Sequence, residues 1–253
     1  ATGRCQWTVE CGESIAAVAW SPTSMLLAVA SGNVVRLLVP ASLPGADDAA
    51  ALLTRTVDTS VAAKSVVQWR RSTEYSRDLV AGAVDLVHEH PVTSVAWHRR
   101  GDYLAVLLPQ APTTSQGLVM HQLSRRMSLH PFGKLPAGSL RAVAFHPTRP
   151  QLLLATAQHV RVYDLLAQRL VKKLTPGGHA RSISTIAVHG GGDNVLVGTE
   201  GERVVWFDLD WSSDPYRALH IHDGAVRSVA FSPSFPLFAS VGDDAAVHVY
   251  HAT

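Results

Sequence analysis

The sequence is short of cysteine, of charge and of long apolar runs. Its cysteines are Cys5 and Cys11, too few for a disulfide-built secreted domain or a four-cysteine zinc site, and this favours a reducing compartment. Charged residues make up 17% of the chain, and 22 Lys and Arg face 20 Asp and Glu, so no basic field for nucleic acid covers the whole protein. No apolar run approaches the roughly 18 residues of a membrane-spanning helix. These absences leave a globular chain with enough apolar residues for a buried core.

Motifs of catalysis are missing as well. The glycine-rich run HGGGDN, residues 189–194, lacks the Lys-Ser/Thr pair and the helix start of a phosphate-binding loop, and no Gly-x-Ser-x-Gly elbow occurs. The pairs His88/His90 and His220/His222 suggest a metal site, but no third and fourth ligand follows with consistent spacing. We therefore predict no catalytic residues, no metal, no cofactor and no small-molecule substrate. The first residues show no basic segment followed by an apolar one, so we expect no signal peptide.

What the chain does contain is an internal repeat. The segment SVAFSP, residues 228–233, recurs as AVAWSP, SVAWHR, AVAFHP and, more loosely, TIAVHG. The anchor residues lie 77, 48, 43 and 43 residues apart, and they are Trp20, Trp97, Phe145, Val188 and Phe231. The last three spacings match the period of roughly 40–45 residues of WD-type propeller repeats.

Each anchor precedes short alternating runs of Val, Leu and aromatic residues, separated by Gly, Pro and Asp, which is the pattern of an antiparallel meander. The third run closes on an aromatic residue, often with an acid, as in Tyr163-Asp164 and Phe207-Asp208, a relaxed form of the Trp-Asp pair of WD repeats. We predict an all-β WD-repeat β-propeller in which five blades are recognisable.

The last repeat carries a polar set. In WD repeats a His before the first strand can bond a Ser or Thr on the second strand and an Asp in the following turn. His222, Ser240 and Asp244 stand in those places, and Tyr250 stands at the Trp position. Because buried polar groups must be paired, we predict that this set fixes the blade and does no chemistry.

Two intervals exceed the repeat. We interpret residues 41–66, rich in Ala, Asp, Thr and Ser, as an insertion at a blade rim and not as a sixth repeat. PQAPTTSQG, residues 109–117, is predicted to be a long loop between strands. Insertions in propellers lie in loops and commonly form binding surfaces.

Basic residues occur in four doublets, among them Arg99-Arg100 and Lys172-Lys173. A solvated surface explains any one doublet, but four in a protein of net charge +2 indicate local positive patches. Arg99-Arg100 is predicted in a turn on a propeller face and Lys172-Lys173 on an outer, fourth strand, where such residues can contact RNA phosphates without reading sequence. The candidate contacts for a partner or for RNA are Arg99, Arg100, Arg141, Arg149, Lys172 and Lys173.

Longer runs resemble one family, the block-of-proliferation ribosome biogenesis proteins. The matching runs, over essentially the whole chain, include WHRRGDY (97–103), FHPTRPQL (145–152), VRVYDLLAQRLVKKL (160–174), WFDLD (206–210) and the terminal VHVYHAT. The resemblance implies a non-catalytic scaffold in the nucleolus and nucleoplasm that acts with Pescadillo and a second WD-repeat protein. It also implies that the protein is required for maturation of the large-subunit rRNA precursor, and that it contacts pre-ribosomal particles and their pre-rRNA.

The resemblance further implies seven blades, two more than the repeats show. VHVYHAT ends on a strand that would leave a bare sheet edge, which all-β proteins avoid. We therefore expect residues 1–253 to form a partial propeller that lacks one blade before Trp7 and one after Thr253. A second hypothesis stays open, namely a WD-repeat substrate receptor or adaptor in signalling or ubiquitin-ligase assembly.

Overall fold

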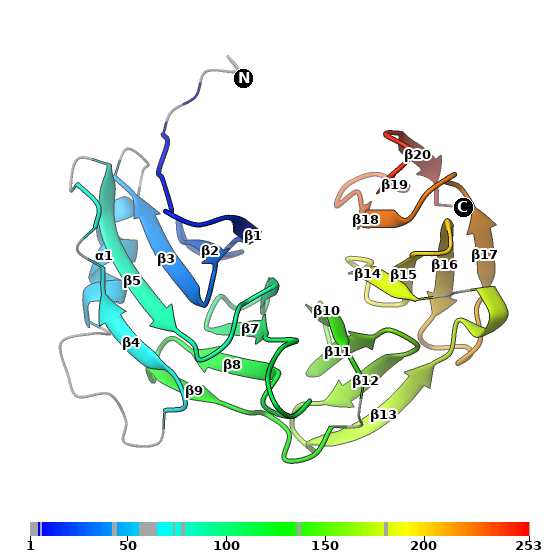
Figure 1. The fold of residues 1–253 in the computed structure, drawn as a ribbon, viewed down its shortest axis with the longest axis horizontal. Helices are drawn as coiled ribbons and strands as arrows, with labels where there is room; N and C mark the ends of the chain where they lie inside the picture. The colour runs from blue at the N-terminus through cyan, green and yellow to red at the C-terminus, as the bar shows by residue number, and fades with distance from the viewer. Residues whose placement is uncertain are drawn as a thin grey trace. The chain divides into compact units, whose positions relative to one another are not determined.

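Five antiparallel sheets make up most of the protein (Figure 1). The computed structural model describes residues 5, 7–41, 45–55, 65–72, 74–76, 79–135, 138–179 and 182–252. The chain divides into two compact units, Ala1–Leu135 and Pro136–Thr253. Each sheet corresponds to one sequence repeat, and the prediction of an all-β, WD-repeat fold is confirmed. Among the described residues, no helix is both long and apolar enough to cross a membrane.

The first unit contains two sheets, with the strand orders β1-β2-β3-β5-β4 and β6-β7-β8-β9. Its elements are β1 (Ile15–Trp20), β2 (Leu27–Ser31), β3 (Val34–Pro40), α1 (Ala46–Arg55), β4 (Gln68–Arg71), β5 (Val80–Val87), β6 (Ser94–Trp97), β7 (Tyr103–Leu107), β8 (Leu118–Gln122) and β9 (Met127–Leu129). The predicted loop at residues 109–117 lies between β7 and β8.

The second unit contains three sheets, each a meander in chain order. Its elements are β10 (Leu140–Phe145), β11 (Gln151–Thr156), β12 (Val160–Asp164), β13 (Arg169–Leu174), the short 3₁₀ helix η1 (Gly177–His179), β14 (Ile183–Val188), β15 (Asn194–Thr199), β16 (Arg203–Asp208), β17 (Arg217–His220), β18 (Val226–Phe231), β19 (Leu237–Gly242) and β20 (Val247–His251).

The anchor of each repeat is the last residue of the first strand of its sheet. Four of these first strands also carry a β-bulge near their start, where the pairing with the second strand skips one residue. The skipped residues are Ala16, Arg141, Ser184 and Arg227. Because a bulge re-aims the side chain of the extra residue, the same place in each repeat points a side chain out of the ladder.

The acid that closes the third strand has a local role. Asp164 Oδ1 accepts the N–H groups of Leu166 and Ala167, each at 2.8 Å. Asp208 Oδ1 likewise accepts the N–H groups of Asp210 and Trp211, which follow it by two and three residues. Such Asp-capped turns satisfy N–H groups that the ladder no longer pairs, which explains why an acid follows the aromatic residue in these repeats.

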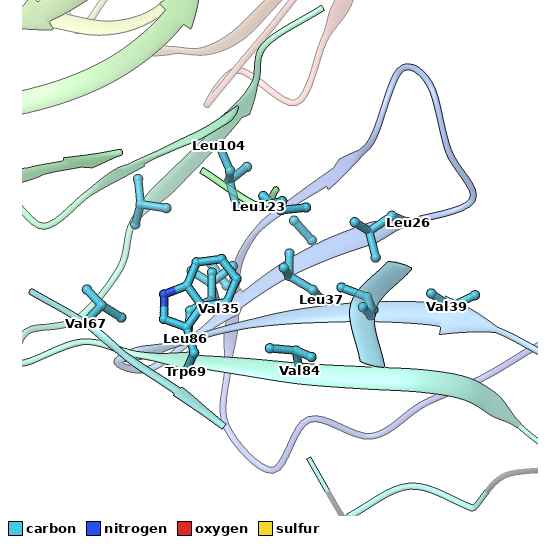
Figure 2. Packing of buried hydrophobic residues seen from close by; sticks show 14 of the residues in the cluster. Leu26, Val35, Leu37, Val39, Val67, Trp69, Val84, Leu86, Leu104 and Leu123 are labelled. Atoms are coloured by element: carbon cyan, nitrogen blue, oxygen red, sulfur yellow. The ribbon is translucent and has the colours of Figure 1, made fainter. Parts of the chain in front are cut away.

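Helix α1 lies inside the segment that we interpreted as a rim insertion, and the sequence analysis did not predict it. Ala46, Ala49, Ala50 and Leu53 are buried and follow the i, i+3, i+4, i+7 spacing of one helix face. This face packs against β3 and β5 and joins the core that they share with β2 and β7 (Figure 2). Gly82 of β5 lets the helix approach closely, since a Cβ there would lie 3.2 Å from Ala50. Residues 42–44 and 56–64 of the segment lie outside the described residues, so its limits stay a prediction.

Candidate functional site

The turn after each first strand begins with a side chain that accepts a hydrogen bond. In the second unit, His146 Nδ1 accepts the N–H of Thr148 at 3.2 Å and the N–H of Arg149 at 3.0 Å. In the other four sheets a side chain at the same place also accepts an N–H of its turn. The five residues, each directly after an anchor, are Ser21, His98, His146, His189 and Ser232. These local bonds fix the turns, so the arginines on them start from a rigid backbone.

Arg99 and Arg100 lie in the turn between β6 and β7, and both side chains are exposed. Thr23 Oγ1 donates to the carbonyl of Arg100 at 3.4 Å, which holds the backbone of the turn. Burial lowers the pKa of His98, and the charges of Arg99 and Arg100 lower it further. In the described part of the chain, neither arginine side chain forms an ion pair or a hydrogen bond, so both charges face solvent.

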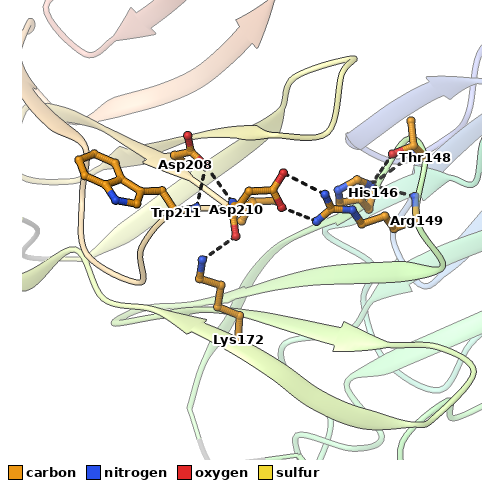
Figure 3. Close-up of polar contacts among 8 residues, drawn as sticks. His146, Thr148, Arg149, Lys172, Asp208, Asp210 and Trp211 are labelled. Atoms are coloured by element: carbon orange, nitrogen blue, oxygen red, sulfur yellow. Dashed lines mark hydrogen bonds and ion pairs between the residues drawn. The ribbon is translucent and has the colours of Figure 1, made fainter.

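Arg149 and Lys172 hold the loop between β16 and β17 (Figure 3). Arg149 Nη1 and Nη2 contact the two carboxylate oxygens of Asp210 at 2.7 and 2.9 Å, and this bond from Arg149 lowers the pKa of the Asp210 carboxyl group. Lys172 Nζ donates to the carbonyl of Leu209 at 2.5 Å. Both cations are therefore engaged within the protein. The loop that they fix carries Trp211, whose side chain is 74% exposed and which the sequence analysis missed.

Arg141 is the bulged residue of β10. Its Nη1 lies 3.8 Å from Glu200 Oε1, and the two side chains are 40% and 41% exposed. An ion pair as exposed as this one contributes little to stability. It does place an acid beside Arg141, which lowers the positive charge that Arg141 offers to a partner.

Lys172 and Lys173 lie on β13, the outer strand of its sheet, and point to opposite faces. Lys172 is paired with Val162 of β12, whereas Lys173 is paired with Arg161. Since neighbouring residues of a strand alternate between faces, the doublet does not form one patch. Of the six predicted contacts, Arg99, Arg100 and Lys173 present exposed charge without a partner among the described residues, and the other three have partners.

The predicted polar set is assembled in the last sheet. His222, which is 1% exposed, has Nδ1 at 2.8 Å from Asp244 Oδ2 and Nε2 at 2.8 Å from Ser240 Oγ. Burial raises the pKa of Asp244, but the bond from His222 and two backbone N–H groups outweigh it and lower the pKa. An ionised Asp244 accepts the Nδ1 proton, so Nε2 accepts from Ser240. Tyr250 stacks on Phe238, with ring centres 5.3 Å apart.

His248 gives this set a third residue with metal-binding chemistry. Ligand atoms of His222, Asp244 and His248 lie within 4.8 Å of one another, and the described residues contain no other such group. Both ring nitrogens of His222 are already hydrogen-bonded, so the hydrogen-bonding capacity of the ring is filled within the protein. His220 does not join it, because its Nε2 contacts Glu202 Oε2 at 3.0 Å.

A second buried network lies in the first unit, and of its residues the sequence analysis singled out His88 alone, in the pair His88/His90. Trp69 Nε1 donates to Ser128 Oγ at 2.8 Å, Ser128 Oγ lies 2.7 Å from His121 Nδ1, and His121 Nε2 lies 3.1 Å from His88 Nε2. All four residues are buried. The donors and acceptors match if Ser128 donates to His121 and His121 donates to His88. Burial lowers the pKa of His88 to about 4 and the pKa of His121 well below its ordinary value.

An open hollow of about 720 Å³ lies beside the turn between β1 and β2. Trp20, Pro22 and Met25 line it, together with the first turn of α1. Asp48 is the ionisable residue of its lining, so the hollow has the apolar character of a contact surface and lacks a paired acid and base.

One protein-family model matches the chain, the WD domain, G-beta repeat, over residues 209–251. The match begins directly after β16 and runs through β20, so it includes β17 and the whole His222 set. The other four repeats rest on the spacing of their anchors and on the matching sheets.

Three curated relatives illustrate the similarity. The chain is 45% identical over 262 residues to "Ribosome biogenesis protein BOP1 homolog" of Anopheles gambiae, 44% over 257 residues to "Ribosome biogenesis protein BOP1" of Homo sapiens, and 43% over 253 residues to the homolog of Chlamydomonas reinhardtii. The alignments cover 99% of this chain and 29%, 33% and 31% of the relatives, so the chain spans about a third of their length. Along nearly all of its residues, the predicted resemblance to the block-of-proliferation ribosome biogenesis proteins is thereby confirmed.

Proposed function

We propose that this chain is the propeller part of a ribosome biogenesis factor, a scaffold without catalysis of its own. It would bind protein partners and precursor rRNA during assembly of the large ribosomal subunit. The observation that carries the proposal is the 41–45% identity, along 99% of the chain, to relatives named for ribosome biogenesis. Partners of this scaffold would be a Pescadillo-type protein and a second WD-repeat factor, in the nucleolus and nucleoplasm.

The geometry supports a role in presenting side chains. The turn that carries Arg99 and Arg100 is held by the acceptor His98 Nδ1, and the loop that carries Trp211 is held by Arg149 and Lys172. A rigid scaffold with exposed Trp and Arg side chains suits partner binding, since these residue types carry much of the energy of interfaces. Their fixed positions reduce the entropy that is lost on binding.

The test uses the full-length protein, purified by an affinity tag from cells, with identification of the proteins and RNA that accompany it. We expect pre-ribosomal particles. The double variant Arg99→Glu/Arg100→Glu should reduce co-sedimentation with these particles severalfold and leave the melting temperature unchanged, because neither side chain has a partner within the described protein. The matched control is Arg125→Glu/Lys134→Glu, which changes the net charge equally at two other exposed positions.

Lys172 is a poor target for such a test, because its replacement would also remove the bond to the Leu209 carbonyl. Equal sedimentation of the two double variants would remove Arg99 and Arg100 from the contact surface. Recovery of ubiquitin-ligase or signalling subunits in place of pre-ribosomal particles would contradict the proposal and favour the substrate-receptor hypothesis.

A further inference from the structure

Two sheets carry a buried arginine at the same position of the third strand. Arg36 of β3 is paired with Val29 of β2, and Arg161 of β12 is paired with Leu154 of β11. Val29 and Leu154 hold the same place relative to the bulge of their first strands. The side chains of both arginines are buried, Arg36 being 8% and Arg161 9% exposed. The two sheets therefore place the same cation at the same position relative to the second strand and to the bulge of the first.

The first of these arginines has its counter-charge within the protein. Asp85 of β5 lies directly opposite Arg36, and Arg36 Nε is 3.9 Å from Asp85 Oδ1. Glu74 adds a second carboxylate, at 3.6 Å from Arg36 Nη2. Burial of an unpaired cation costs free energy, and here β5, the strand next to β3, supplies the opposite charge.

The second arginine has a cation where the first has an acid. Lys173 of β13 lies directly opposite Arg161. His159 precedes Arg161 by two residues. Burial lowers the pKa of His159, and the charges of Lys173 and Arg161 lower it further. In the described part of the chain neither Arg161 nor Lys173 forms a hydrogen bond or an ion pair, and the buried His159 Nδ1 has no hydrogen-bond partner.

This arrangement is unfavourable for the protein alone. Like charges directly opposite each other on paired strands are destabilising. An anion from outside would offset this repulsion. We propose that Arg161, Lys173 and His159 form a binding site for a phosphate group at the outer edge of this sheet.

The three side chains fit the chemistry of phosphate. Guanidinium offers parallel N–H donors to two oxygens, lysine adds a point charge, and an imidazole N–H can donate to a further oxygen. Lys173 is exposed, so the phosphate can reach the site from solvent. The phosphate can belong to an RNA backbone or be free inorganic phosphate. The RNA source rests on the proposed function, whereas the phosphate site does not.

The chain supplies its own control, because Lys173→Asp would copy the Arg36–Asp85 pair into the second sheet. We compare the melting temperature of the purified protein and of this variant in phosphate and in chloride at equal ionic strength. Phosphate should raise the melting temperature of the unchanged protein. In the absence of phosphate, Lys173→Asp should raise the melting temperature above that of the unchanged protein. The same variant should weaken phosphate binding at least about tenfold, since one donor becomes a repelling charge. Lys134→Asp, at an exposed position of the first unit, should leave the phosphate response unchanged.

A second readout follows His159 by NMR. Bound phosphate should raise the pKa of His159, because a nearby anion favours the charged imidazole. Unchanged titration of His159 in phosphate, or a phosphate response that survives Lys173→Asp, would overturn the proposal. If Lys173→Asp misfolds, Arg161→Gln tests the same point, since it removes the buried charge and should abolish the shift of His159.

The source of the phosphate is decided by competition with a single-stranded RNA oligonucleotide. Displacement of inorganic phosphate by the RNA, with the same loss in Lys173→Asp, supports an RNA-backbone site. Phosphate binding without competition by RNA supports a site for free phosphate. Either result stands apart from the proposed function, which is decided by co-sedimentation with pre-ribosomal particles.

Discussion

Acidification should destabilise the first unit through the buried network of His88 and His121. Burial lowers the pKa of His88 to about 4, from an ordinary value of 6.5, so the folded protein holds it neutral over a range in which the unfolded chain protonates it. The stabilisation is therefore complete above pH 6.5 and is lost as the pH falls towards 4. At about 1.36 kcal/mol per pKa unit, the contribution of His88 amounts to about 3 kcal/mol. The lowered pKa of His121 acts in the same direction.

The assay is urea unfolding, followed by tryptophan fluorescence, at a series of pH values across this range. The matched variant is His88→Gln, which cannot titrate but keeps an acceptor for the Nε2 proton of His121. The difference in unfolding free energy between protein and variant cancels the contributions of the carboxylates and of the histidines distant from His88, which both proteins share. This difference should shrink by about 3 kcal/mol on acidification, in favour of the variant. Parallel pH profiles for the two proteins would refute the assignment of His88 as a buried neutral group.

Two further substitutions test contacts in the second unit, both by chemical denaturation. Gly192→Ala should cost at least about 2 kcal/mol, because Gly192 has a φ of +85° and a Cβ there would overlap the buried ring of His146, whereas Gly190→Ala, with open space around it, should be nearly neutral. Ser240→Ala should cost about 1 kcal/mol, because it removes the donor to the buried Nε2 of His222, and a cost indistinguishable from zero would show that this bond does not stabilise the blade.

The repeat predicted the sheets because its recurring residues are those that favour strands and turns. Trp20, Trp97, Phe145, Val188 and Phe231 all end the first strand of a sheet. Small residues precede each anchor and a turn-forming residue follows it. The meander is therefore determined by residues that are close together in the sequence, and a sequence pattern can detect them. The same reasoning explains the outer strand with Lys172 and Lys173, which follows the third strand β12 after a short turn.

The same sequence pattern could not predict which charged side chains have a partner of opposite charge. Arg149 and Arg99 occupy similar turns, yet Arg149 is neutralised by Asp210, which is 61 residues away in the sequence. Arg36 and Arg161 likewise differ only in what the neighbouring strand places opposite them. Pairings of this kind depend on which strands become neighbours and on register, and a shift of one residue would send each side chain to the other face. The network of Trp69 and His121 is hidden for the same reason.

The helix α1 changes how the protein can be shortened. By repeat length alone, residues 46–55 are surplus, and a protein engineer would remove them to reach a minimal blade. Yet Ala46, Ala49, Ala50 and Leu53 fill space against β3 and β5, so excision would strip apolar surface from two strands at once. A shortened protein would therefore need polar substitutions on both strands to keep its newly bared surface in solution.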